Sequence, residues 1–265
     1  MRTLAEHFKC DPATLSENQL REYYVFLRQE KHWKGSAMTQ ARVALRSFFR
    51  ETLTVGKDWT VFEDLCIARP EPLPLVLSQE EVKRVLGVLR QPRFRTCLRL
   101  IYHCGLRVGE AVSLAPTDIH GREKPPRLHI KNAKGGKDRY VPIAPDMVEE
   151  LRQWWRTHGN RHWLFPAQQK GLAAAAVQSC MSVACVQQAF VLARQESEIH
   201  PAAHVHTLRH SYATHMLEAG VNIRQLRDYL GHRSLDTTLI YTHLTALSEA
   251  RTQATMQTLY QALKG

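Results

Sequence analysis

Apolar residues recur every three to four positions along most of the chain, which is the period of an amphipathic helix. Ser16 followed by Gln19 resembles a capping box, and Ser78 and Ser182 begin further periodic stretches. The predicted helices cover residues 16–27, 36–53, 78–89, 94–104, 146–157, 182–195, 207–219, 222–230, 234–244 and 248–263. The spacing therefore predicts a mainly helical protein.

The period changes to two between residues 127 and 143. Apolar and polar residues alternate over 127–130 and 139–143, and residues 133–138 between them read Ala-Lys-Gly-Gly-Lys-Asp. Two alternating runs joined by a glycine-rich turn are typical of a β-hairpin. The expected fold class is mainly α with a small antiparallel β-sheet, and Lys134 lies at the hairpin tip.

A proline-rich segment marks a domain boundary. Three prolines fall within residues 69–74, where they remove backbone donors and favour extended geometry. We expect a short helical domain over residues 1–70 and a larger domain over residues 71–265.

The charge of the chain indicates a polyanionic partner. The 265 residues contain 36 Lys and Arg against 25 Asp and Glu, a formal net charge of +11 with a pI near 9.6. The first 70 residues carry a net charge of +2 and the remainder +9. A positive field of this size attracts nucleic acid whatever the fold. The ordinary share of hydrophobic residues, 44%, excludes disordered and collagen-like classes.

Cysteine usage and the chain ends indicate the compartment. The six cysteines form no CxxC pair, so we expect reduced thiols and a cytoplasmic, nucleoid-associated protein. The N-terminus lacks the apolar run of a signal peptide. The longest uncharged stretch, residues 171–193, contains several glutamines and serines, which argues against a membrane partner.

The helix predicted over residues 36–53 carries a basic stripe. Arg42, Arg46 and Arg50 recur every four residues and line up on one face. Such a stripe can follow a phosphate backbone. A solvated charged face is an equally good interpretation of three arginines taken alone.

Cationic side chains also occur where an anion can bind. His206 and Arg209 stand three residues apart at a helix start, so they project to one side near the positive end of the helix dipole. Arg107 follows a helix break at Gly105, and Lys134 adjoins the glycines of the hairpin. Each of these charges alone is more often a solvated surface group.

Tyr241 is the candidate nucleophile. If Ser234 caps the helix predicted over residues 234–244, Tyr241 shares its polar face with Thr237 and Thr238. On spacing alone a tyrosine is more often a packing residue. A phenol with a pKa of about 10 is a weak nucleophile, so attack on a phosphodiester needs a base and stabilisation of the phosphorane. Two arginines can supply that stabilisation, and a lysine can protonate the 5′ oxygen as it leaves, without a metal or other cofactor.

Five landmarks follow one another in a fixed order. They are Gly-Leu-Arg-Val-Gly-Glu at 105–110, Lys134, His-Thr-Leu-Arg-His at 206–210, Leu-Gly-His at 230–232, and Tyr241 nine residues after His232. In this order and spacing the chain resembles the tyrosine recombinases, also called the phage integrase family, over about residues 73–250. The family's catalytic domain is preceded by a helical core-binding domain that clamps DNA, and about 70 residues precede the linker here, fewer than is usual.

The resemblance implies a role for each landmark. It implies that Tyr241 is the nucleophile, forming a 3′-phosphotyrosyl bond, and that Arg107 and Arg209 bind the scissile phosphate. Lys134 would be the general acid. His206 would accept a proton or bind phosphate, and His232 would bond to a non-bridging oxygen. The implied activity is site-specific DNA recombination through a Holliday junction, in the integration or excision of a mobile element.

The resemblance also implies partners. The protein is expected to act on double-stranded DNA as a homotetramer, with the helix over residues 248–263 exchanged between protomers. A tail packed on its own domain is the alternative. The expected DNA contacts are Arg42, Arg46, Arg50, Lys137 and Arg139.

Other functions fit parts of the pattern. Residues 207–219 and 222–230 can be interpreted as the helix-turn-helix of a non-catalytic DNA-binding protein. His206 and His210 have the spacing of two zinc ligands, although HExxH and a third carboxylate ligand are missing. A topoisomerase of the IB type shares the tyrosine chemistry, but the short chain and the spacing favour a recombinase.

Overall fold

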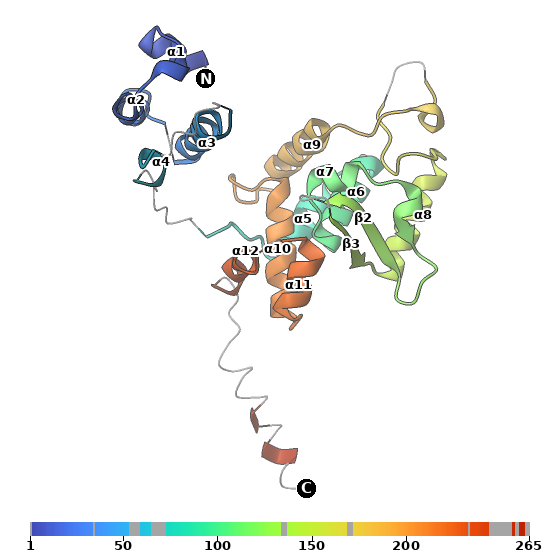
Figure 1. Ribbon diagram of the computed structural model, residues 1–265. Helices are drawn as coiled ribbons and strands as arrows, with labels where there is room; N and C mark the ends of the chain where they lie inside the picture. The colour runs from blue at the N-terminus through green and yellow to red at the C-terminus, as the bar shows by residue number, and fades with distance from the viewer. Residues whose placement is uncertain are drawn as a thin grey trace. The chain divides into compact units, whose positions relative to one another are not determined.

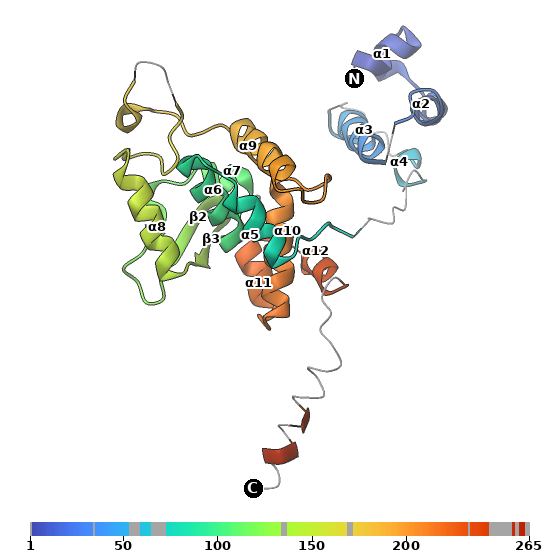
Figure 2. The same ribbon diagram turned by 180° about the vertical axis from the view of Figure 1, so that it is seen from behind.

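Helices dominate the computed structural model, which describes residues 2–33, 35–52, 59–64, 73–133, 137–168, 172–232, 234–243, 256–257 and 260–262. The chain divides into two units, Met1–Pro72 and Leu73–Gly265, each with its own hydrophobic core (Figures 1 and 2). The one small sheet is antiparallel. The predicted fold class is therefore confirmed.

The first unit is built from short helices. They are α1 (Arg2–Phe8), η1 (Pro12–Thr14), α2 (Glu17–Gln29), α3 (Gly35–Ser47), the π-helical turn η2 (Phe48–Thr52) and α4 (Val61–Asp64). Ser16 caps α2 through the predicted capping box: its Oγ accepts from Gln19 N at 3.4 Å, and its own N–H donates to Gln19 Oε1 at 2.8 Å. Leu20, Leu27 and Phe49 are buried in the core of this unit.

The second unit surrounds a small sheet with helices. Its helices are α5 (Gln79–Gly87), α6 (Pro92–Cys104), α7 (Val108–Val112), η3 (Pro116–Asp118), α8 (Pro145–Arg156), η4 (Ala174–Ala176), α9 (Val183–Glu196), α10 (Val205–Glu218), α11 (Ile223–Leu230), α12 (Asp236–Leu239) and η5 (Ile240–His243). Its strands are β1 (Ile119–His120), β2 (Arg127–Ala133) and β3 (Lys137–Pro142). Ser78 and Ser182 cap α5 and α9, as their sequence positions predict.

The sheet has the order β1-β2-β3, with both pairs antiparallel. In the predicted hairpin Leu128 faces Val141 and Ile130 faces Arg139. Leu128, Ile130 and Val141 are buried, so alternate side chains of the hairpin reach the core. The strand β1 was not predicted, because two residues are too short to show a period. The hairpin tip at residues 134–136 lies outside the described residues.

Helix α10 lies within the second unit, in contact with α6, α9, α11 and η5. Polar and apolar side chains alike are buried along it, namely Val205, Thr207, Leu208, Arg209, Ser211, Tyr212, Ala213, Thr214 and Leu217. A helix covered on several sides loses the simple amphipathic period. Side chains from several elements therefore converge on α10.

The structure corrects the prediction for Tyr241. The helix expected over residues 234–244 is instead the four-residue α12 followed by the 3₁₀ turn η5. A 3₁₀ turn has three residues per turn rather than 3.6, so the side-chain directions change after Leu239. Tyr241 is only 3% exposed and packs with Tyr212 and Leu230 rather than lying on a polar face.

Within the described residues, no helix combines the length and apolar character needed to cross a bilayer. The tail helix expected over residues 248–263 falls almost entirely outside those residues. Its exchange between protomers thus stays a prediction.

Replacing Gly105 by alanine should destabilise the protein. Gly105 has φ of 61°, and a Cβ atom there would lie 2.3 Å from the Tyr212 ring. The left-handed backbone alone costs a non-glycine residue on the order of 1–3 kcal/mol, and displacement of the buried ring adds to this. Chemical denaturation of Gly105→Ala should show a loss of at least about this size.

Gly87→Ala is the matched control. Gly87 ends α5, and nothing lies within 4 Å of a Cβ atom built on it. Because alanine is the better helix former, this variant should be unchanged or more stable by up to about 1 kcal/mol. Equal stability of the two variants would contradict the role assigned to the Gly105 turn.

Candidate active site

The end of α6 places Arg107. Gly105 caps α6 in the left-handed conformation, and Arg107 then becomes the N-cap of α7. The Arg107 N–H donates to Glu110 Oε2 at 2.9 Å, and its Nη1 donates to Glu110 Oε1 at 2.8 Å. Arg107 Nε and Nη2 have no partner among the described residues, and the side chain is 27% exposed. Arg107 therefore keeps donors that can bind an anion.

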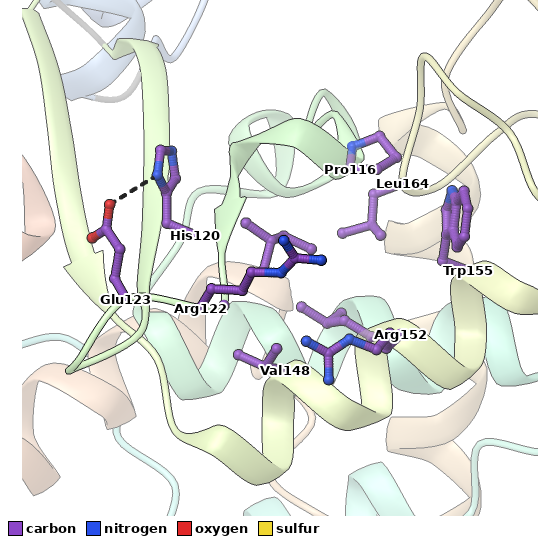
Figure 3. A pocket seen from close by; sticks show the side chains of 11 residues that line it. Pro116, His120, Arg122, Glu123, Val148, Arg152, Trp155 and Leu164 are labelled. Atoms are coloured by element: carbon purple, nitrogen blue, oxygen red, sulfur yellow. Dashed lines mark hydrogen bonds and ion pairs between the residues drawn. The ribbon is translucent and has the colours of Figure 1, made fainter.

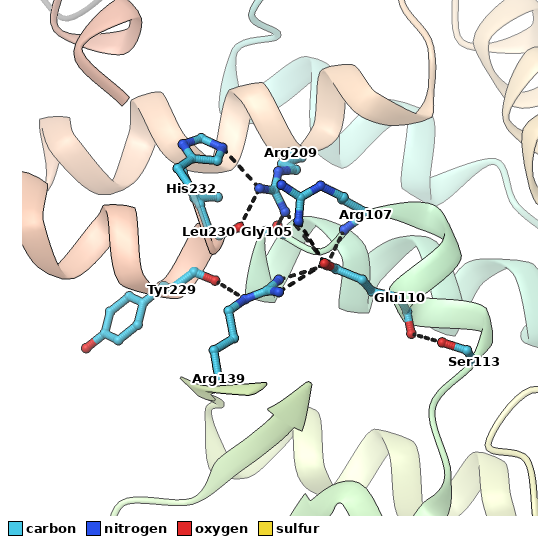
Figure 4. A network of polar contacts seen from close by, with 9 residues as sticks. All are labelled: Gly105, Arg107, Glu110, Ser113, Arg139, Arg209, Tyr229, Leu230 and His232. Atoms are coloured by element: carbon cyan, nitrogen blue, oxygen red, sulfur yellow. Dashed lines mark hydrogen bonds and ion pairs between the residues drawn. The ribbon is translucent and has the colours of Figure 1, made fainter. Parts of the chain in front are cut away.

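Glu110 joins three arginines from different elements (Figure 4). Arg139 on β3 donates from Nη1 and Nη2 to the two carboxylate oxygens at 2.9 and 2.8 Å. Arg209 on α10 places its Nη1 3.8 Å from Glu110 Oε2. With Arg107, these contacts tie α7, β3 and α10 to one carboxylate.

The charge of Glu110 is fixed by these neighbours. Burial by itself raises the pKa of a carboxyl group, but the hydrogen bonds and charge of Arg139 and the hydrogen bonds of Arg107 outweigh it, lowering the pKa of Glu110 to about 2. Glu110 is therefore an anion at neutral pH.

Arg209 is buried and held by acceptors. Its side chain is 1% exposed, its Nη1 donates to Gly105 O at 2.8 Å, and its Nη2 donates to Leu230 O at 2.6 Å. Burial, followed by the charge of Arg107, lowers the pKa of Arg209 to about 10, so the side chain stays charged at neutral pH. Its Nε has no partner in the described part of the chain and remains available to a ligand.

The geometry around His232 differs from the expected role. Arg209 Nη2 lies 3.1 Å from His232 Nε2, and because a guanidinium only donates, Nε2 must accept. His232 Nδ1 then carries the hydrogen and donates to Thr238 Oγ1 at 2.9 Å. Burial and the charges of Arg209 and Arg107 lower the pKa of His232 to about 3. Both nitrogens have protein partners, so His232 holds Arg209 rather than presenting a donor to a phosphate oxygen.

Tyr241 is paired with a histidine that the sequence analysis did not assign to the tyrosine chemistry. His210 Nδ1 lies 2.8 Å from Tyr241 Oη, and the two ring centroids are 5.7 Å apart. Burial raises the pKa of Tyr241, although the charges of Arg209 and Arg107 oppose the shift. In the sequence, His210 belongs to the landmark at 206–210 and stands four residues after His206, a spacing that was weighed only as a zinc-binding alternative.

His206 lies beside this pair. Its ring is edge-on to that of His210 with 4.6 Å between centroids, and its side chain is exposed. Desolvation, then the charges of Arg209 and His204, lower the pKa of His206. No hydrogen bond joins His206 to Tyr241 among the contacts of the described residues. In the same residues, no group of three or more His, Cys, Asp or Glu side chains is arranged to hold a metal ion.

The structure corrects the expectation that Arg139 contacts DNA. Its side chain is 8% exposed, and Arg139 Nε donates to Tyr229 O at 2.7 Å while the two Nη groups bind Glu110. Nε and one N–H of each Nη group are thus engaged inside the protein, and the side chain offers little surface to DNA. Lys134 and the side chain of Lys137 lie outside the described residues, so their roles stay predictions.

The basic stripe of the first unit is only partly exposed. Arg42 is half-buried and its Nη1 donates to Phe62 O at 3.5 Å. Arg46 on α3 and Arg50 in the π-helical turn are exposed. Of the three arginines, Arg46 and Arg50 are the better candidates for DNA contacts.

A hollow of about 430 Å³ lies apart from these residues, between β1 and α8 (Figure 3). Val148, Trp155 and Leu164 form its apolar lining, and Arg122 and Arg152 extend along it. None of the candidate catalytic residues lines it.

Comparison with known proteins finds a matching family for this chain. A family described as the phage integrase family matches residues 76–247. A putative integrase/recombinase of Sinorhizobium fredii is 35% identical over 246 residues, which are 92% of this chain and 94% of that protein.

Solved structures share the fold. XerH site-specific recombinase bound to a palindromic difH substrate has a TM-score of 0.71 at 22% identity, covering 93% of this chain and 73% of that one. The Tn1549 transposon integrase in complex with transposon right end DNA has a TM-score of 0.71 at 15% identity, covering 98% and 92%.

Replacing Glu110 by glutamine should destabilise the protein strongly. The variant keeps the shape of the side chain but leaves the buried Arg139 without its counter-charge, a change that typically costs about 3–5 kcal/mol. The control is Glu149→Gln, whose pair with Arg152 is solvent-exposed and worth roughly 0–1 kcal/mol. Urea denaturation of both variants at pH 7 checks the difference.

The unfolding free energies of wild type and Glu110→Gln should also differ in their dependence on pH. A carboxyl with a lowered pKa stabilises the fold above its ordinary pKa of 4.5, and this stabilisation is lost as the pH falls towards 2. The difference in unfolding free energy between wild type and Glu110→Gln should therefore be constant above about pH 5 and shrink below it. A difference independent of pH down to 3 would contradict the charged state assigned to Glu110.

Proposed function

The chain belongs to the phage integrase family, the tyrosine recombinases, and from this membership we propose that it is a site-specific recombinase that cuts and rejoins double-stranded DNA. The observation that carries the proposal is the Tyr241 hydroxyl held against α10, on which His206, Arg209 and His210 lie within about one turn. Tyr241 Oη attacks the scissile phosphate and forms a 3′-phosphotyrosyl bond. Because Tyr241 is 3% exposed, the η5 segment must shift for the oxygen to meet DNA.

Arg107 and Arg209 bind the non-bridging oxygens of that phosphate. Backbone carbonyls and His232 hold Arg209, and Glu110 holds Arg107, so both charges are in place before DNA enters. Donors fixed in advance stabilise the phosphorane without the cost of reorganisation. Arg209 Nε, with Arg107 Nε and Nη2, supplies the unused donors.

Lys134 acts as the general acid on the leaving 5′ oxygen. His206 serves as a phosphate ligand, a role supported by its exposure and its lack of a described bond to Tyr241. The phosphotyrosyl bond keeps the energy of the phosphodiester, so the strands rejoin without ATP. This scheme needs no cofactor.

The partners follow from the same proposal. Four protomers assemble on DNA around a Holliday junction, and the tail over residues 248–263 packs on a neighbouring protomer. Arg46 and Arg50 of the first unit, together with Lys137, contact the DNA backbone. The structural neighbour named as a transposon integrase supports a role in mobile-element integration or excision. A DNA substrate in turn implies action in the cytoplasm at the nucleoid.

Covalent capture tests the nucleophile. Wild-type protein incubated with nicked duplexes taken from the DNA flanking its own gene should form a denaturant-resistant adduct, which mass spectrometry maps to Tyr241. Tyr241→Phe should form none, because phenylalanine fills the same buried volume but has no oxygen. Tyr212→Phe, the loss of another buried hydroxyl nearby, should retain the adduct. An adduct that persists in Tyr241→Phe assigns the nucleophile elsewhere.

Lys134→Ala tests the general acid. Single-turnover cleavage should slow by roughly 10²–10⁴-fold, because the 5′ oxygen leaves without a proton. A duplex with sulfur at the 5′ bridging position should restore the rate, since a thiolate is a good leaving group without protonation. Lys131→Ala is the control, because Lys131 pairs with Asp118 at 2.5 Å. Normal cleavage by Lys134→Ala would transfer the role to Lys131 or Lys137.

A further inference from the structure

The hydrogen bond between His210 and Tyr241 has a chemical consequence beyond packing. Given the recombinase chemistry proposed above, on which this inference rests, we propose that His210 is a catalytic residue. It accepts the phenolic proton of Tyr241 during strand cleavage and returns that proton during strand joining. The geometry that carries the proposal is the 2.8 Å separation of His210 Nδ1 from the oxygen that attacks phosphorus.

The direction of this hydrogen bond follows from charge. A neutral phenol has one hydrogen to donate, and a neutral imidazole has one nitrogen that accepts. Burial lowers the pKa of His210 to about 4, and His206, His204 and Arg209 lower it in the same direction. Burial also raises the pKa of Tyr241. At neutral pH the pair is therefore an uncharged phenol donating to an uncharged imidazole.

The lowered pKa of His210 and the raised pKa of Tyr241 explain why the proton stays on Tyr241 until substrate binds. The imidazolium of His210 is disfavoured chiefly by burial, and to a smaller extent by the charges of its neighbours, of which Arg209 is one. A phosphodiester bound to Arg107 and Arg209 brings one negative charge into the site and offsets that repulsion. DNA binding thus makes His210 a stronger base at the moment when Tyr241 needs one.

The cleavage step balances with His210 in this role. Tyr241 Oη forms a bond to phosphorus while its proton passes to His210 Nδ1, giving an imidazolium. The bond from phosphorus to the 5′ oxygen breaks, and Lys134 gives its proton to that oxygen. Strand joining reverses each transfer, so no external oxidant, base or nucleotide is consumed.

Two other histidines on α10 show that the placement is specific. His206 lies edge-on to His210 with 4.6 Å between centroids and has no hydrogen bond to Tyr241 among the described contacts. His215 Nδ1, five residues further along the helix, makes a similar bond to Tyr102 Oη at 2.9 Å. His215 therefore offers a matched histidine–tyrosine pair that lies outside the proposed machinery.

The test compares His210→Asn with His215→Asn in the full chain. Asparagine retains a hydrogen-bond acceptor but cannot take up a proton, so it separates positioning from proton transfer. The nicked duplexes that capture wild type serve as the probe, and adduct formation is followed in single-turnover mode from pH 7 to 9. Thermal unfolding of each variant confirms that it is folded. His210→Gln serves as a second variant at the same position.

His210→Asn should slow adduct formation by roughly 10²–10⁴-fold, whereas His215→Asn should stay within about threefold of wild type. Without an acceptor the phenol must ionise first, so the His210→Asn rate should rise about tenfold per pH unit, while wild type changes little. A structural role alone lowers the rate without creating this slope.

Three results overturn the inference in distinguishable ways. Cleavage by His210→Asn within about threefold of wild type removes the proton-acceptor role and leaves the recombinase intact. A slow variant with the wild-type pH profile assigns His210 to positioning only. Absence of a Tyr241 adduct in wild type itself overturns the proposed function, and this inference with it.

Discussion

A buried carboxylate surrounded by arginines is the interaction on which this site depends. Glu110 on α7 binds Arg107 and both Nη groups of Arg139 from β3. It also lies 3.8 Å from Nη1 of Arg209 on α10. Moving such charges out of water costs several kcal/mol per ion, so they persist only where the fold supplies every partner. The folding energy of the second unit therefore holds Arg107 and Arg209, the two arginines proposed to bind the scissile phosphate, in position.

The arginines proposed to bind a phosphate also affect the protonation state of the neighbouring histidines. Desolvation and nearby positive charges lower the pKa of His206, His210 and His232 and keep all three uncharged at neutral pH. Neutral rings can accept hydrogen bonds, and two of them do so: His232 from Arg209 and His210 from Tyr241. An anionic substrate changes this balance directly, which couples binding to the chemistry of the site.

The sequence predicts an element correctly where the interactions that form it join residues close together in the chain. A capping serine satisfies donors within three residues, a glycine ends a helix by its own backbone freedom, and a hairpin pairs neighbouring runs. Ser16, Ser78, Gly105 and the strands flanking residues 134–136 were identified for these reasons. The very short β1 and the 3₁₀ turn under Tyr241 carry no such signal.

By itself, the sequence determined the fold class, the helix caps, the hairpin and the order of landmarks that identifies the family. Only the tertiary structure decided that Arg139 is a buried partner of Glu110 rather than a DNA contact, that His232 holds Arg209, and that Tyr241 is buried against His210. These contacts join residues 29, 23 and 31 positions apart. No helical or strand period relates such positions, so their meeting depends on how the elements pack around α10.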